Sequence, residues 1–244
     1  MAPIQADIEH SPAFAGLPRI PCFIGQQLSF AGGPHRQRLE ALTAQRRSVP
    51  RGEDLFRQGD RLSALYQVCA GWFKTSLSDS NGRCQVTGFQ MSGDMLGLDG
   101  IGDGCHSVAA VALDDALVCV IPYAALEQLV LENHNLRREF HRLLSLEIGR
   151  EQAMMLLLGT MTAEGRIAAF VLDLATRQRD RGYSASSLVL RMSRDEIGSF
   201  LGLQLETVSR SFSRLQSDGV LKIRHRNIDL LDEPALRRIV GGTS

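Results

Sequence analysis

The chain has 244 residues, 44% of them apolar, and its 27 basic and 27 acidic residues give a formal net charge of zero. This length suits one large domain or two ordinary ones, and no stretch is long and apolar enough to span a bilayer. The first ten residues lack a basic region followed by an apolar run, so we expect a cytoplasmic protein that does not bind membranes. Zero net charge alone argues neither for nor against nucleic-acid binding, although residues 161–244 carry 13 Lys and Arg against 10 Asp and Glu.

The first half of the chain is predicted to form an irregular segment followed by a β-roll. Residues 1–48 contain five prolines, which interrupt any long element. In residues 49–133, short apolar or alternating runs such as ALYQVCAGWFKTSL and CQVTGF are separated by many glycines. Closely spaced strands and turns of this kind are typical of an all-β roll or barrel. The glycine-dense run SGDMLGLDGIGDG indicates a tight loop near a potential pocket, but glycine content alone is a weak sign of phosphate binding.

After Pro122 the pattern becomes helical. A short helix is expected first, then a long helix over residues 134–160, which is a natural connector and a natural seam between two copies of the chain. Residues 161–244 are predicted to form a small α-rich domain, with a helix from Ala163 and a strand at LVLRM. The predicted fold class is therefore α+β, with a β-roll, a long helix and a C-terminal domain in that order.

A helix-turn-helix is the strongest motif of the C-terminal domain. Ser193-x-x-Glu196 is a capping box that begins a helix ending near Gly202. A second helix follows within about three residues and ends at Asp218-Gly219, where glycine permits a left-handed cap. The next run, VLKIRHRNIDLL, reads as strand, polar turn and strand, which predicts a wing.

The second of these helices has an unusual outer face. Its inward positions are predicted to be Leu205, Val208, Phe212 and Leu215, and its outer face carries Glu206, Ser209, Arg210 and Ser213. In a helix-turn-helix this helix enters the major groove, where Arg210 can donate two hydrogen bonds to guanine and Glu206 can accept one from cytosine. Ser209 can bind a base or a phosphate, and Lys222 and Arg226 of the wing are candidate backbone contacts. Ser193 and Ser213 are further candidate DNA-binding residues. The alternative is a solvated face with a Glu206–Arg210 ion pair, worth only about 0.2–0.5 kcal/mol.

The motif DEIGSFLGLQLETVSRSFSRLQSDGVL resembles the DNA-binding domain of the Crp/Fnr family of bacterial transcription regulators. Upstream segments, among them RGEDLFRQGD, TGFQMSGDMLGLDGIG and MMLLLGTMTAEGRIAAFVLDL, resemble its Fnr-like branch, and the resemblance covers about residues 49–240. It implies a cyclic-nucleotide-binding-like jelly roll, a dimerisation helix, a winged helix-turn-helix, a homodimer and contact with RNA polymerase. Members with Glu-x-x-Ser-Arg in the recognition helix read a palindrome resembling TTGAT-N4-ATCAA, and this motif is Glu206, Ser209 and Arg210 here.

The roll departs from the members of the family that bind cyclic nucleotides. Those members carry a Glu for the ribose and an Arg-Ser or Arg-Thr for the phosphate, and the matching positions here are Leu98 and Cys105 to Ser107. Leu98 offers no hydrogen bond to a ribose. An imidazole such as that of His106 cannot replace a permanently charged, bidentate arginine. Cyclic AMP is therefore not expected as a ligand.

The cysteines also depart from the family. Fnr proper holds a [4Fe–4S] cluster with three N-terminal cysteines and one in the roll. Cys119 matches the roll cysteine, but the N-terminal segment offers only Cys22, so we expect no such cluster and no other metal site. Inert thiols are the favoured interpretation, and a redox-responsive Cys22–Cys119 pair stays open. None of the six histidines lies in a recognisable ligand pattern, which leaves haem open and the signal, if any, unidentified.

The resemblance implies that two copies pair through the long helix. Steps of three and four residues give one stripe, which consists of Arg137, His141, Leu144, Ile148, Glu151, Met155 and Leu158. The apolar members suit a coiled-coil seam, whereas Glu151 would meet its own copy. We predict that Glu151 keeps the dimer marginal, unless it turns outward or pairs with a nearby arginine such as Arg150.

A different class of function remains as the alternative: a small-molecule-binding β-roll protein whose helix-turn-helix serves packing or partner contact. An enzyme is not expected, because no Ser-His-Asp order, metal motif or phosphate loop is credible in this sequence. Target genes, and activation or repression at each promoter, stay open.

Overall fold

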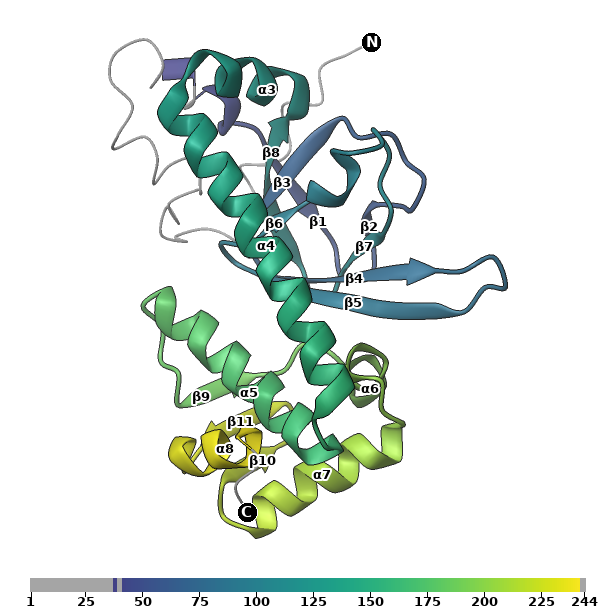
Figure 1. Cartoon of the computed structure of the whole chain (residues 1–244), viewed down its shortest axis with the longest axis vertical. Helices are drawn as coiled ribbons and strands as arrows, with labels where there is room; N and C mark the ends of the chain where they lie inside the picture. Colours follow the sequence, from purple (N-terminus) through teal and green to yellow (C-terminus); the bar gives the residue numbers. More distant parts are fainter. Residues whose placement is uncertain (1–36, 39–40, 242–244) are drawn as a thin grey trace. The chain divides into compact units, whose positions relative to one another are not determined.

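The computed structural model describes residues 37–38 and 41–241 (Figure 1). The chain divides into two compact units between Leu146 and Glu147, within the long helix, and each unit is described by itself. Most of the predicted irregular segment 1–48 lies outside the described residues, and so does Cys22. No helix in the described ranges is long and apolar enough to cross a membrane.

The N-terminal unit contains the predicted β-roll, built from two antiparallel four-stranded sheets in the orders β1-β8-β3-β6 and β2-β7-β4-β5. The strands are β1 (Arg46–Val49), β2 (Asp54–Phe56), β3 (Ala64–Ala70), β4 (Trp72–Ser78), β5 (Cys84–Met91), β6 (Met95–Leu96), β7 (Ala109–Ala112) and β8 (Ala116–Pro122). The roll begins at Arg46, earlier than the predicted residue 49, because the first three residues of β1 are polar and exposed and give no apolar signal.

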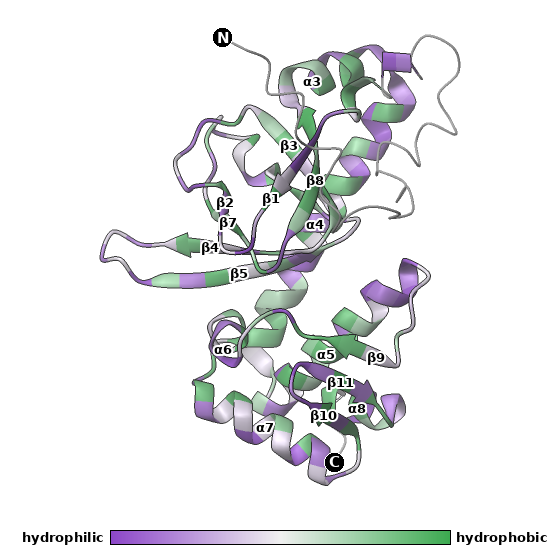
Figure 2. Ribbon diagram, turned by 180° about the vertical axis from the view of Figure 1, so that it is seen from behind, coloured by the Kyte–Doolittle hydropathy of each residue, from purple (hydrophilic) through white to green (hydrophobic). Residues whose placement is uncertain are grey.

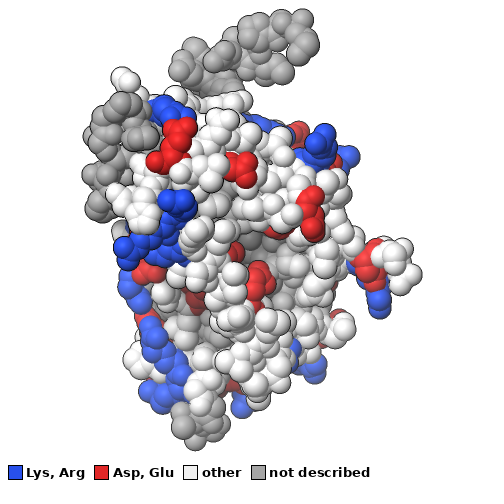
Figure 3. All heavy atoms as spheres, turned by 45° about the horizontal axis from the view of Figure 1, so that its top comes forward, with Lys and Arg blue, Asp and Glu red and all other residues white. Residues whose placement is uncertain are grey.

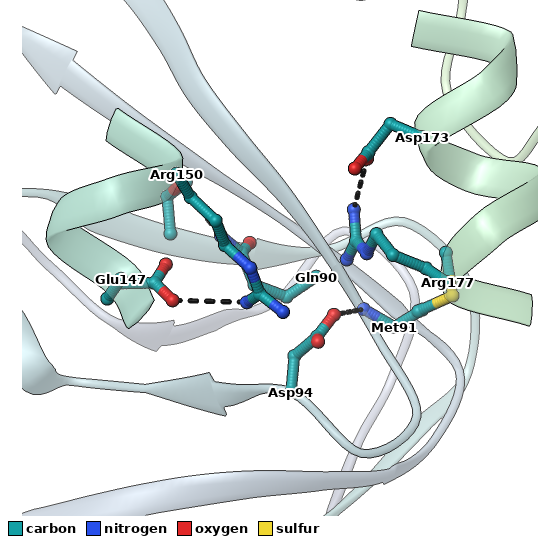
Figure 4. Close-up of polar contacts among 8 residues, drawn as sticks. Gln90, Met91, Asp94, Glu147, Arg150, Asp173 and Arg177 are labelled. Atoms are coloured by element: carbon teal, nitrogen blue, oxygen red, sulfur yellow. Dashed lines mark hydrogen bonds and ion pairs between the residues drawn. The ribbon is translucent and has the colours of Figure 1, made fainter. Parts of the chain in front are cut away.

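Apolar side chains from both sheets fill the interior of the roll. Phe56, Tyr66, Phe73 and Val118 belong to one buried cluster, and full burial of such a side chain contributes about 1.5–3 kcal/mol. Tight turns join the strands; in the turn after β5, the Asp94 carboxylate accepts a hydrogen bond from the Met91 backbone N–H at 2.9 Å (Figure 4). Packing between the two sheets therefore stabilises the roll.

Two helices follow the roll, as predicted: α3 (Tyr123–Glu132) and the long α4 (His134–Thr160). Between them, the Asn133 side chain accepts a hydrogen bond from the Leu136 N–H at 3.0 Å and so caps the start of α4. A second buried cluster joins α3 and the first turn of α4 to strands β3 and β8, and it consists of Leu65, Cys119, Ile121, Leu126, Leu129 and Leu136. The short glycine-dense run forms β6 and the 3₁₀ helix η2 (Leu98–Gly100).

The C-terminal unit is a winged helix-turn-helix, which confirms the predicted fold class. Its elements after α4 are α5 (Ala163–Asp180), β9 (Ser187–Val189), α6 (Arg194–Leu201), α7 (Leu205–Ser217), β10 (Leu221–Arg224), β11 (Asn227–Leu230) and α8 (Glu233–Val240). The predicted strand at LVLRM is present but ends at Val189, and α8 was not predicted. Along α5, Asp173 and Arg177 form an i, i+4 ion pair at 3.3 Å (Figure 4).

Candidate nucleic-acid interface

The turn between α6 and α7 is fixed by caps at both ends of α6. At its start, the Glu196 N–H donates to Ser193 Oγ at 3.1 Å and the Ser193 N–H donates to the Glu196 carboxylate at 2.7 Å, which is the predicted capping box. At its end, Gly202 has φ 63°, a left-handed conformation that favours glycine. A Cβ on Gly198 would lie 2.5 Å from the Leu203 carbonyl oxygen, so the turn also requires glycine there.

The inner face of α7 packs the helix onto the rest of the unit. Val208, Phe212 and Leu215 are buried, as predicted, and Ser211 is buried beside them. Leu205 was predicted to face inward, and this was wrong, because its side chain is 43% exposed. Leu205 is the first residue of α7 and lies beyond the packed part of the stripe. In Figure 2, polar and apolar residues alternate along α7 as expected of an amphipathic helix.

The outer face of α7 is open to solvent. Glu206, Ser209, Arg210 and Ser213 are all exposed. Within the described part of the chain, neither Glu206 nor Arg210 takes part in an ion pair, so the alternative of an internal Glu206–Arg210 pair is not observed. Ser213 Oγ donates to the Ser209 carbonyl at 3.0 Å, which leaves only its acceptor capacity for other partners. The guanidinium and the carboxylate are therefore both available to a ligand.

The wing consists of β10, β11 and the turn at His225 and Arg226, where His225 has φ 56°. Lys222 and Arg226 are exposed. The wing is attached to α7 through Gln216, whose side-chain oxygen accepts from the Ile223 N–H at 2.9 Å. Two exposed cations thus extend from a strand pair that is hydrogen-bonded to the helix.

The contact that Arg194 makes with Phe212 was not predicted from the sequence. The Arg194 guanidinium lies 3.6 Å from the centre of the Phe212 ring, a cation–π contact between α6 and α7. Burial lowers the pKa of Arg194 from its ordinary value, and its Nη1 is buried without a hydrogen-bond partner among the described residues. An exposed arginine and a stacked arginine look alike in sequence, so no signal distinguished this residue.

Basic and acidic side chains are both present on the face drawn in Figure 3. This agrees with a net charge of zero for the whole chain. Any DNA contact must therefore depend on local groups such as those of α7 and the wing rather than on a strong overall field.

At the positions that match the nucleotide-binding residues of the family, the roll carries Leu98 and residues 105–107. Leu98 packs against the second apolar cluster. His106 is buried, stacks on Phe56 with ring centres 3.8 Å apart, and has Nδ1 3.5 Å from Asp99. The Asp99 carboxylate itself accepts the Ser107 N–H at 2.8 Å and the Val108 N–H at 3.3 Å. The backbone N–H groups of Ser107 and Val108 are thus already hydrogen-bonded to a carboxylate of the protein itself.

The described cysteines and histidines form no obvious metal site. Cys119 is buried and its thiol donates to the Thr43 carbonyl at 3.1 Å, whereas Cys84 and Cys105 are exposed and Cys69 is half-buried. In the described ranges, no three His, Cys, Asp or Glu side chains gather closely enough to hold a metal ion. These residues alone do not fit a four-cysteine cluster. His10 and His35 lie outside the described residues.

The predicted stripe on α4 is largely uncovered. Ile148 and Met155 are 59% and 65% exposed, His141 and Glu151 are exposed, and Leu144 and Leu158 are half-buried. Leu146 and Leu156, which were not predicted, add to the exposed apolar surface.

The alternative in which Glu151 pairs with Arg150 is not observed among the described residues. Arg150 forms an ion pair with Glu147 at 3.1 Å (Figure 4) rather than with Glu151. Desolvation, and then the charge of Glu147, raise the pKa of Glu151 above its ordinary value.

Known proteins match both units. Residues 46–133 match the cyclic nucleotide-binding domain family and residues 165–239 match the Crp-like helix-turn-helix domain family. The chain is 42% identical over 225 residues to the transcriptional regulatory protein btr of Bordetella pertussis, covering 91% of this chain and 93% of that protein. It is 38% identical over 205 residues to the fumarate and nitrate reduction regulatory protein of Escherichia coli, covering 84% and 82%. The solved structure of FixK2 from Bradyrhizobium japonicum has a TM-score of 0.74 at 31% identity, covering 80% of this chain and 96% of that one.

Proposed function

Because this chain belongs to the Crp/Fnr family of transcription regulators, we propose that it binds, as a homodimer, a palindrome resembling TTGAT-N4-ATCAA and contacts RNA polymerase there. In this proposal Arg210 donates to guanine, Glu206 accepts from the cytosine amino group, and Ser209 binds a base or a phosphate. Ser193, Lys222 and Arg226 bind the DNA backbone and fix the register of the helix. A cytoplasmic location is part of the proposal.

The observation that carries the proposal is the outer face of α7. A carboxylate, a hydroxyl and a guanidinium are exposed together on a helix whose opposite face is buried, and no ion pair within the described residues neutralises Glu206 or Arg210. A face that bound only phosphates would need cations alone, whereas base edges present both donors and acceptors. The mixed chemistry therefore favours base recognition.

The exposed apolar side chains of α4 support pairing of two copies. Four of the ten exposed large apolar side chains of the described residues belong to this helix: Leu146, Ile148, Met155 and Leu156. Ile148 and Met155 lie seven residues apart and so share one face of the helix, and a second copy of the same helix would offer a matching surface.

The alternative, a small-molecule-binding roll with a helix-turn-helix that serves packing, has less support. Packing would bury the outer face of α7, and the side chains of this face are exposed. In the roll, the interior is filled by side chains such as Phe73 and Val118. We propose that this protein needs neither cyclic AMP nor a [4Fe–4S] cluster; haem stays open. The relatives are named as transcription regulators, and catalysis is not part of the proposal.

Fluorescence anisotropy with labelled duplexes tests the proposal. A duplex with the palindrome and one with both half-sites scrambled are titrated over a series of salt concentrations. We expect a preference of at least about a thousandfold for the palindrome. The logarithm of the binding constant should fall linearly with the logarithm of the salt concentration. Equal, weak binding of both duplexes would contradict the proposal and favour the alternative, a small-molecule-binding roll.

A further inference from the structure

The side chain of Arg166, near the start of α5, joins three segments of the C-terminal unit. Its Nη2 donates to the Leu158 carbonyl at 2.7 Å, its Nη1 to the Leu201 carbonyl at 3.0 Å and its Nε to the Met161 carbonyl at 3.1 Å. Leu158 lies in the last turn of α4, Leu201 is the last residue of α6, and Met161 lies between α4 and α5. A single guanidinium thus connects the end of the long helix to the helix-turn-helix.

The chemistry of this contact requires an arginine. The last carbonyl groups of a helix have no partner within the helix, and they carry the negative end of the helix dipole. The ends of α4 and α6 both direct such a carbonyl at Arg166. A planar guanidinium with five N–H donors can serve three acceptors in fixed directions, whereas a lysine ammonium is a compact charge on a flexible stem.

The surroundings hold Arg166 in place. Its backbone N–H donates to the Thr162 carbonyl at 2.9 Å, and Thr162 caps the same helix. A Cβ on Gly202, the left-handed residue that ends α6, would lie at van der Waals distance from both Arg166 Nη1 (3.5 Å) and Leu158 Cδ2 (3.8 Å). The end of α4, the start of α5 and the turn before α7 therefore form one packed joint.

We propose that Arg166 is a positioning residue that fixes the angle between α4 and the helix-turn-helix, and thereby sets the spacing of the half-sites that the dimer accepts. This inference rests on the proposed function. In a dimer joined through α4, the angle at each joint determines the distance and rotation between the two copies of α7. One additional base pair moves a half-site by about 3.4 Å and turns it by about 35°, so a rigid joint discriminates against it.

The experiment uses full-length protein and palindromes whose half-sites are separated by three, four, five or six base pairs. Arg166→Met removes the three hydrogen bonds and the charge, and Arg166→Lys keeps the charge but not the fork. Arg238→Met is the matched control, because Arg238 is 62% exposed in α8 with one long contact to Asp232 at 3.9 Å. Anisotropy gives the affinity for each spacer, and sedimentation equilibrium gives the dimer dissociation constant.

We expect wild-type protein and Arg238→Met to prefer the four-base-pair spacer by about a hundredfold, since bivalent binding is lost when geometry forbids it. In Arg166→Met and Arg166→Lys this ratio should fall by about tenfold, while the dimer dissociation constant stays within about twofold of wild type. A general loss of stability would weaken binding to every spacer and leave the ratio unchanged. If Arg166→Met does not fold, Arg166→Lys decides the question.

Two contrary results are distinguishable. If wild-type protein does not prefer a palindrome over scrambled DNA, the proposed function fails, and this inference fails with it. If wild-type protein does discriminate among spacers and both Arg166 variants keep the same ratio, the inference about Arg166 alone is overturned.

Discussion

In the C-terminal unit, the outer face of α7 presents Glu206, Ser209 and Arg210 to solvent, whereas the ligand positions of the roll carry Leu98 and His106, which are packed into the protein. Both units keep the fold of their family. They differ in the side chains with which that fold would bind a partner. A unit can therefore have the fold of its family without the family's binding side chains, so function has to be argued from the residues of the site.

The long helix α4 links the two regions, and we expect the largest effect from its acidic residue. In a parallel dimer, two Glu151 carboxylates about 4 Å apart would repel by about 4 kcal/mol at an effective dielectric near 20, before relaxation or proton uptake. Glu151→Leu and Glu151→Ala should therefore tighten dimerisation and raise DNA affinity at low protein concentration. Sedimentation equilibrium measures this, and an unchanged or weaker dimer in both variants rules the idea out.

The same residue predicts a pH dependence. The pKa of Glu151 is already raised by desolvation and by Glu147, and a second carboxylate in the dimer would raise it further. A group whose pKa is higher in the dimer binds a proton on association, so the dimer should tighten as the pH falls towards the pKa of Glu151 and weaken as the pH rises. Glu151→Leu should remove the part of the trend that comes from the carboxylate.

A substitution in the turn of the helix-turn-helix should destabilise the C-terminal unit and leave the roll unchanged. A Cβ on Gly198 would clash with the Leu203 carbonyl at 2.5 Å, and Gly198→Ala should destabilise the C-terminal unit by about 1–3 kcal/mol. Gly149, in α4, has no atom within 4 Å of the corresponding position, and Gly149→Ala should be neutral or stabilising by up to about 1 kcal/mol. Thermal denaturation and DNA binding check the pair. Equal behaviour of the two variants would contradict the importance of this turn.

The wing should contribute affinity without specificity. Lys222→Ala and Arg226→Ala each remove an exposed cation, and each should weaken palindromic and scrambled DNA alike, with the salt dependence reduced by about one counterion. The ratio of the two affinities is the quantity to measure. A variant that changed this ratio would have to contact a base.

The smallest effects are expected in the roll. Because Leu98 packs against an apolar cluster and the Asp99 carboxylate already accepts from the Ser107 N–H, cyclic AMP at millimolar concentration should leave the melting temperature unchanged. Protein purified without oxygen should carry substoichiometric iron, which absorption spectroscopy and metal analysis would measure. A rise of several degrees in the melting temperature with cyclic AMP, or four irons per chain, would show that the roll does bind a ligand and would contradict this prediction.

Much of the C-terminal unit could be predicted because its signals are local. The capping box at Ser193, the left-handed Gly202 and the alternation along α7 each act within a few residues of sequence. The burial of Ser211 and the exposure of Leu205 depend on where α7 meets its neighbours, which periodicity does not report.

Long-range contacts could not be predicted. Arg166 reaches the Leu201 carbonyl 35 residues away, and Arg194 stacks on Phe212 in another helix. In sequence both are arginines in amphipathic helices, without any mark of these contacts. Strand β1 was missed for a related reason, since pairing of Arg46 with Cys119 in β8, rather than an apolar pattern, makes it a strand.

The most direct test of the account is a double-mutant cycle between Arg210 and the guanine of each half-site. Wild-type protein and Arg210→Ala are titrated with the palindrome and with a palindrome in which that G·C pair is replaced in both half-sites. If Arg210 reads the guanine, Arg210→Ala costs about 1–3 kcal/mol on the natural palindrome, and replacing the base pair costs nothing further in that variant. If Arg210→Ala keeps the wild-type preference for guanine, α7 does not read this base, and the central claim is wrong.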